Sequence, residues 1–167
     1  PIMVMNASQH FFYVNSAAYA AAGITAETPN PPGGDYGARN GTLTGIVAEA
    51  AAMLSFMKLT SAITPADIAA AITGIAAAAA KVGVTYVHEA ATGAIAGVTE
   101  VDLLHQTFAQ PGFPIRGSLS LWGERLEEFT AAGLSPGSGD DRLRSQTVKW
   151  VSDGSNQGYS GYLRENY

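Results

Sequence analysis

The sequence predicts an α/β fold built on a parallel sheet, and three observations support that prediction. Apolar segments typical of strands alternate along the chain with segments of helical periodicity. The chain is 47% hydrophobic and only 14% charged, a composition that suits elements covered on two faces. Most of the predicted helices are followed by glycine or proline, which are typical of helix ends.

The first third of the chain is predicted to form a strand, a helix, an ordered loop and a second helix. Ile2–Met5 is a short apolar run, typical of a buried strand. Val14–Ala22 is a short helix because Gly23 follows it. Residues 28–40 are rich in proline and glycine and form the loop. Helical spacing of apolar residues predicts a helix over 46–57, with Ile46, Ala50, Met53, Leu54 and Met57 on one face.

The rest of the chain is predicted to form three helices, each followed by a strand. The clearest helix begins at Thr64, which can cap it, has Pro65 at its first position and ends at Gly83. Its apolar face consists of Ile68, Ile72, Ile75, Ala79 and Val82. The following elements are a strand over 84–89, a helix over 99–109, a strand over 113–121, a helix over 124–132 and a strand over 147–151.

Two parallel architectures are compatible with this order. A doubly wound sheet closes within this length, but neither G-x-G-x-x-G after a strand nor G-x-x-x-x-G-K-[ST] occurs. A (β/α)₈ barrel needs about 250 residues. Four strands would therefore make about half of a barrel plus an insertion.

Composition excludes several classes of function. The net charge is −5 and the nine basic residues form no stripe, so we expect no nucleic-acid partner. The absence of cysteine excludes disulfides, thiolate metal sites and cysteine nucleophiles. No apolar run approaches the roughly 20 residues of a membrane span. The chain opens at Pro1 without Met or a signal-peptide pattern, so we expect a fragment or a processed chain.

Polar residues near strand ends are the candidates for chemistry, because parallel α/β folds build active sites at the carboxyl ends of strands. His10 follows the first predicted strand, His88 ends the second, and Lys149 and Asp153 lie on and just past the last. No H-x-H, H-E-x-x-H or G-x-S-x-G occurs, so the signatures of zinc proteases and serine hydrolases are absent.

Lys149 is the most specific of these candidates. Alternation places it on one face of the predicted strand with Thr147 and Val151, and on the face of Asp153 if the strand continued. Burying an ammonium costs several kcal/mol unless it is paired or neutralised. A desolvated lysine can form a Schiff base, donate to an anion, or accept carbon dioxide and become a metal-binding carbamate. The alternative is an ordinary lysine on a half-exposed strand.

The other candidates each have an ordinary structural interpretation. His88 is a ligand, a general base or a hydrogen-bonded strand residue, and His10 stands among aromatic residues that could simply pack around it. His105 lies in the middle of a predicted helix, and we expect a structural role. Glu49 is expected to be a solvated or capping carboxylate. Residues 153–158 form either a backbone-rich ligand loop or a plain turn.

Five segments, in order and spanning nearly the whole chain, resemble a known family. They are His10–Ser16 with Ala21–Ile24, Thr28–Gly34, Gly41–Ala50, Gly83–Ala90 and Lys149–Gly158, the last reading Lys-Trp-Val-Ser-Asp-Gly-Ser-Asn-Gln-Gly. Together they resemble amidohydrolase family 3, in the YtcJ-like branch that includes N-substituted formamide deformylases. The third segment departs from the family pattern, with Leu43 where proline is usual.

The resemblance implies a partial (β/α)₈ TIM barrel of the metal-dependent hydrolase type. Residues 1–167 would form a single incomplete barrel segment. Residues 1–60 supply a strand, the Pro/Gly-rich insertion and a helix, and residues 61–167 supply the βα units. One or two divalent ions, usually zinc, would activate water for attack on an amide- or formamide-type C–N bond of a small molecule.

The resemblance also implies roles for individual residues. Lys149 would be a metal ligand as a carboxylated lysine. His10, His88, Asp153 and Gln157 would contact the substrate or surround the metal ligands.

The ligand set implied by the family is incomplete in this sequence. The H-x-H pair would lie before the first residue, and two histidines and an aspartate would lie beyond the last. A single ligand cannot hold a catalytic metal, so we expect the isolated chain to be inactive and metal-free. We also expect a homo-oligomer, or association through exposed sheet edges. Two alternatives stay open: a non-catalytic module that binds itself or a partner, and a Schiff-base lyase or aldolase using Lys149.

Overall fold

The chain forms two compact units in the computed structural model, which describes residues 1–60, 63–165 and 167. One unit combines Pro1–Ala62 with Val151–Tyr167, and the other comprises Ile63–Trp150. We call them the N-terminal unit and the βα unit. Both contain helices and sheets, and the βα unit contains the parallel sheet, so the predicted α/β class is confirmed.

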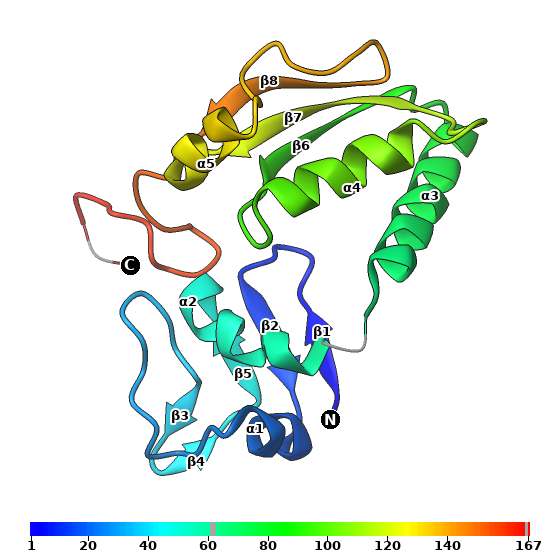
Figure 1. Ribbon diagram of the computed structural model, residues 1–167. Helices are drawn as coiled ribbons and strands as arrows, with labels where there is room; N and C mark the ends of the chain where they lie inside the picture. The colour runs from blue at the N-terminus through cyan, green and yellow to red at the C-terminus, as the bar shows by residue number, and fades with distance from the viewer. Residues whose placement is uncertain (61–62, 166) are drawn as a thin grey trace. The chain divides into compact units, whose positions relative to one another are not determined.

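The N-terminal unit is built on an antiparallel sheet of three strands in the order β1-β2-β5 (Figure 1). Strand β1 (Met3–Met5) pairs with β2 (Phe11–Val14), and β2 pairs with β5 (Ile46–Ala48). A small antiparallel pair joins β3 to β4. The remaining elements are β3 (Ala38–Arg39), β4 (Thr42–Leu43), α1 (Ser16–Ala22), α2 (Glu49–Met53) and the 3-10 helix η1 (Leu54–Thr60).

Two predictions for this unit are wrong. The first strand does not join the parallel sheet, because a tight turn with Gln9 at φ 64° folds the chain back into a hairpin, and the Asn6 N–H donates to Phe11 O. The helix predicted over 46–57 begins only at Glu49, because Ile46–Ala48 pairs with β2 instead.

The βα unit alternates strictly between helices and parallel strands. Its helices are α3 (Pro65–Lys81), α4 (Val98–Phe108), the 3-10 helix η2 (Gly123–Arg125) and α5 (Leu126–Ala131). Its strands are β6 (Tyr86–Thr92), β7 (Arg116–Trp122) and β8 (Leu143–Lys149), hydrogen-bonded in that order. The strand predicted over 147–151 is therefore wrong at both ends, since β8 begins at Leu143 and ends at Lys149.

Helix α3 confirms the boundary signals read from the sequence. The Thr64 hydroxyl accepts from the Asp67 N–H at 3.2 Å, and the Asp67 carboxylate accepts from the Thr64 N–H at 2.9 Å. This reciprocal capping box, with Pro65 directly after it, satisfies amides that the helix itself leaves free.

All three α-helices of the βα unit pack on the same face of the sheet. One core cluster contains Ala76 of α3, Val101 and Phe108 of α4 and Phe129 of α5, together with Leu119, Leu121 and Leu143 of the strands. A doubly wound sheet carries helices on both faces, whereas consecutive βα units of a barrel carry them on one. The layout visible in Figure 1 is thus the single-faced one, and the described strands form an open sheet.

Within the described residues, none of the helices combines the length and the apolar character needed to cross a membrane.

Candidate functional site

The face of the βα sheet that lies away from the helices carries a chain of hydrogen-bonded polar side chains. His88 of β6 is exposed, and its Nδ1 lies 2.7 Å from Ser118 Oγ and its Nε2 2.9 Å from Ser120 Oγ. Ser120 Oγ lies 2.6 Å from Thr147 Oγ1 of β8. The two serines are almost fully buried, so His88 provides a hydrogen-bond partner for the Ser118 hydroxyl, and Ser120 is bonded by both His88 and Thr147.

Lys149 lies at the carboxyl end of β8 and is half-buried. Strand alternation places its side chain on the face of Thr147, which is the polar face. Among the described residues, the Lys149 ammonium has no hydrogen-bond acceptor or ion-pair partner. The strand ends at Lys149, so the condition under which Asp153 would share the face of Lys149 is not met.

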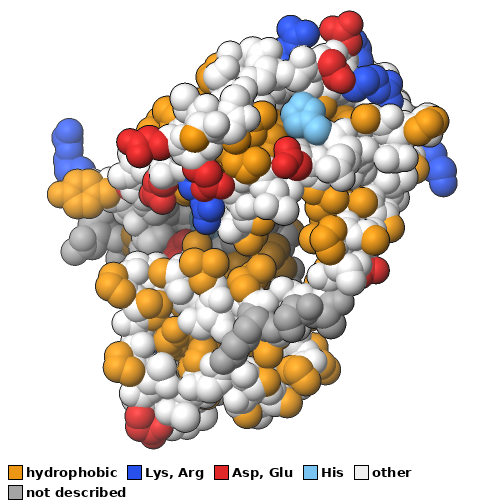
Figure 2. All heavy atoms as spheres, viewed as in Figure 1, with side chains coloured by type: hydrophobic (Ala, Val, Ile, Leu, Met, Phe, Trp, Pro, Cys, Tyr) orange, Lys and Arg blue, Asp and Glu red, His pale blue; other side chains and the backbone are white. Residues whose placement is uncertain are grey.

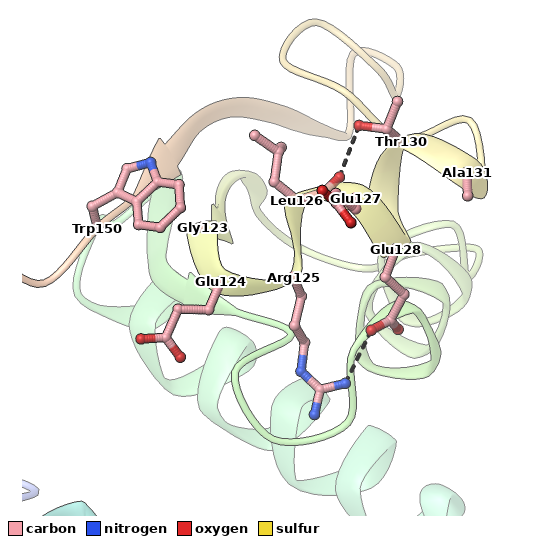
Figure 3. A pocket seen from close by; sticks show the side chains of 9 residues that line it. All are labelled: Gly123, Glu124, Arg125, Leu126, Glu127, Glu128, Thr130, Ala131 and Trp150. Atoms are coloured by element: carbon pink, nitrogen blue, oxygen red, sulfur yellow. Dashed lines mark hydrogen bonds and ion pairs between the residues drawn. The ribbon is translucent and has the colours of Figure 1, made fainter.

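An open hollow of about 880 Å³ lies at the carboxyl ends of β7 and β8. Gly123 follows β7 directly and Trp150 follows β8 directly, and the indole of Trp150 lies against Gly123 (Figure 3). Arg125 and Glu128, which also line the hollow, form an ion pair at 3.1 Å. This is the end of a parallel sheet at which α/β folds place their active sites. The full lining is Gly123, Glu124, Arg125, Leu126, Glu127, Glu128, Thr130, Ala131 and Trp150.

His10 lies in the N-terminal unit, just before β2, and pairs with Glu49 at the start of α2. His10 Nδ1 is 2.9 Å from Glu49 Oε2, with 34% and 14% of the two side chains exposed. Burial raises the pKa of Glu49, but hydrogen bonds from His10, Ser160 and Ser155 outweigh it, so the pKa lies below its ordinary value. The interpretation of Glu49 as a solvated carboxylate is therefore wrong.

Asp153 and Gln157 lie in the loop that follows β8 and belongs to the N-terminal unit. Both are exposed. An oxygen of Asp153 accepts from the Tyr162 N–H at 2.9 Å and the other from Ser152 Oγ at 3.2 Å, so Asp153 shapes the loop itself. The structure thus places His10 with this loop in one unit, and His88 with Lys149 in the other.

Sequence reasoning did not identify two groups of polar residues as part of a site. Glu49 stands in a segment that resembles the family, which was the available signal. Its serine partners lie more than 100 residues away in the sequence, so local pattern could not reveal them. Ser118 and Ser120 alternate with leucines along β7, which is the pattern of a strand with one polar face.

The described residues do not supply a complete metal centre. They contain no group of three or more His, Asp or Glu side chains placed to hold an ion. Lys149, as a carbamate, would add oxygen donors from a single residue, which does not fit a catalytic site by itself.

A sequence profile described as the amidohydrolase family matches residues 1–167, and no curated protein matches. Among solved structures, the chain is similar to the crystal structure of an uncharacterized metal-dependent hydrolase from Pyrococcus furiosus, with 18% identity and a TM-score of 0.57. The match covers 95% of this chain and 31% of that one, so the chain spans about a third of that hydrolase's length.

Proposed function

The chain belongs to the amidohydrolase family, and from that premise we propose that it is the Lys149-bearing part of a metal-dependent hydrolase of amide- or formamide-type C–N bonds. The observation that supports the proposal most is the position of Lys149, at the carboxyl end of a parallel strand and on the face opposite the helices. In a closed (β/α)₈ barrel this face is the interior and this end holds the active site.

The proposed role of Lys149 follows from its environment. Its unprotonated Nζ adds to the carbon of carbon dioxide and releases a proton to solvent, which leaves a carbamate with two oxygen donors. This removes the uncompensated ammonium from the half-buried position and creates a ligand for a divalent ion, which we propose to be zinc. Bound zinc supplies an activated water.

The other ligands are proposed to come from parts of a longer polypeptide, because the described residues lack them. His88 and its hydroxyl partners would line the interior beside Lys149. We propose that the chain belongs to the branch of N-substituted formamide deformylases and that the substrate is a small N-substituted formamide.

The test uses a longer protein that contains this chain and is expressed at about the length of the matched hydrolase. We expect that protein to bind zinc and to release aniline from formanilide, and a chelator to abolish the activity until zinc is returned. The 167-residue chain, assayed beside it, should retain no stoichiometric zinc and show no hydrolysis. A longer protein that hydrolyses no amide, or whose activity is indifferent to chelation, would contradict the proposal.

A second candidate, association of the chain with itself, is favoured by an exposed apolar row on α3. Ile68 and Ile75 of α3 and Val82, which directly follows the helix, are 42%, 71% and 80% exposed. Figure 2 shows hydrophobic side chains gathered over this helix. Their heptad spacing is that of a helix-pairing seam. Asp67 and Lys81 flank the row at opposite ends of α3, so two antiparallel copies would place opposite charges together.

We therefore expect the 167-residue chain to form a dimer through α3, and Ile75→Asp to convert it to a monomer because the new charge falls in the apolar seam. Light scattering after gel filtration measures the mass. Ile95→Asp is the matched control, because Ile95 is also exposed but lies outside α3. A monomeric wild-type chain, or equal dissociation by both substitutions, would contradict this assignment.

A further inference from the structure

Glu49 connects three segments that are far apart in the sequence. Its Oε2 accepts from His10, and its Oε1 accepts from Ser155 Oγ at 3.1 Å and from Ser160 Oγ at 2.7 Å. Gly158 lies against the same oxygen, and a Cβ at that position would overlap it. All five residues belong to the N-terminal unit. A mostly buried carboxylate is thus the common acceptor for both ends of the loop 152–161.

The backbone of Glu49 is strained at the same place. Its φ is +67°, the left-handed region that favours glycine, and its N–H donates to His10 O at 2.8 Å. Such a conformation costs on the order of 1–3 kcal/mol and persists only where its surroundings fix it. Here the N–H bond to His10 O and the bonds of the side chain to His10, Ser155 and Ser160 all hold the residue.

The carboxylate also sets the direction of the serine hydroxyls. An ionised carboxylate only accepts, so Ser155 and Ser160 must both donate to Glu49. Their oxygens are then left to accept, and they do so from the loop: the Gly158 N–H donates to Ser155 Oγ at 2.8 Å and the Ser155 N–H to Ser160 Oγ at 3.0 Å. Loss of the charge on Glu49 would therefore disturb the loop's own hydrogen bonds.

We propose that Glu49 is a positioning residue, whose carboxylate, paired with His10, fixes the loop 152–161 that carries Asp153 and Gln157. The loop begins three residues after Lys149 in the chain. That Asp153 and Gln157 face a substrate rests on the proposed function, whereas the anchoring of the loop does not.

The anchor depends on pH in a definite direction. The pKa of Glu49 is lowered in the folded chain, so its contribution is fully present above the ordinary value of 4.5 and is lost as the pH falls through the lower folded value. His10 is the titratable side chain that acts on Glu49, and the loop contributes the hydroxyls of Ser155 and Ser160.

The test is amide exchange and an NMR titration of the 167-residue chain. Glu49→Gln should speed exchange of the Ser155 and Gly158 amides at least about 10-fold, the loss expected when hydrogen bonds to a charged acceptor are weakened. In the wild type, the Gly158 and Ser160 amide peaks should move in one transition below pH 4.5, and Glu49→Gln should lack that transition. Glu27→Gln makes the same chemical change at an exposed site and should alter neither result.

A second variant covers the case in which Glu49→Gln unfolds the whole unit. Ser155→Ala with Ser160→Ala leaves the His10–Glu49 pair intact and removes only its connection to the loop, so loop exchange should rise while β1, β2 and β5 stay protected. The single variant Ser155→Thr keeps the hydroxyl, so its loop amides should exchange as slowly as those of the wild type. Loop exchange that is unchanged in both Glu49→Gln and the double variant would overturn the proposal, whether or not any longer protein hydrolyses amides.

Discussion

Replacing Phe129 by alanine is expected to lower the free energy of unfolding of the βα unit by about 3–5 kcal/mol. Phe129 is the side chain by which α5 enters the shared core, and it is fully buried. Its ring lies against Gly93, just after β6, where a Cβ would overlap it. The cavity left by alanine cannot be filled by the backbone at Gly93, so the loss should lie near the upper part of that range.

Urea unfolding followed by tryptophan fluorescence measures this effect, because Trp122 and Trp150 both belong to the βα unit. Ile95→Ala is the control, since Ile95 is exposed and exposed substitutions usually change stability by no more than about 0.5 kcal/mol. A Phe129→Ala variant as stable as Ile95→Ala would show that α5 does not pack in this core.

Replacing Lys149 by methionine in the longer enzyme is expected to lower kcat/KM for formanilide by more than about 100-fold. Substitution of residues that only support metal ligands typically costs 10–100-fold, and Lys149 is proposed to be a ligand itself. Methionine keeps the length and the apolar stem but cannot form a carbamate. Arginine keeps a positive charge and should be equally inactive, because a guanidinium does not take up carbon dioxide in this way.

Initial rates and bound zinc, measured together, separate a lost ligand from a lost fold. Lys81→Met is the control: Lys81 is exposed at the end of α3, which leads to the amino end of β6, opposite to the carboxyl ends where Lys149 lies. A Lys149→Met enzyme with full zinc and full activity would remove Lys149 from the site.

The parts of the fold that depend on local sequence could be predicted. Thr64, Pro65 and Gly83 delimit α3 through capping and backbone preference, which act within a few residues. The alternation of helices and strands from residue 64 onward likewise predicted the parallel sheet. The predicted start of the last strand was wrong, because β8 begins at Leu143.

What could not be predicted depends on partners distant in the sequence. Ile46–Ala48 has the apolar spacing of a helix, but pairing with Phe11–Tyr13 makes it a strand; tertiary pairing outweighs local preference there. The burial of Glu49 depends on two serines at the other end of the chain. Charge and spacing around Glu49 itself contain no trace of them.

The position of Lys149 could be predicted in part from the sequence. Alternation with Thr147 gave its face of the strand, and the contact between Thr147 and Ser120 shows which face that is. Alternation alone did not show that β8 ends at Lys149 or that Asp153 belongs to the N-terminal unit.

Carbon-13 NMR can detect the proposed carbamate on Lys149. The longer, zinc-loaded protein is equilibrated with ¹³C-bicarbonate, and its spectrum is compared with those of Lys149→Met and Lys81→Met. We expect a protein-bound carbamate carbon in the wild type and in Lys81→Met, and none in Lys149→Met. A wild-type spectrum without that carbon, or one in which it survives in Lys149→Met, would contradict the proposed carbamate.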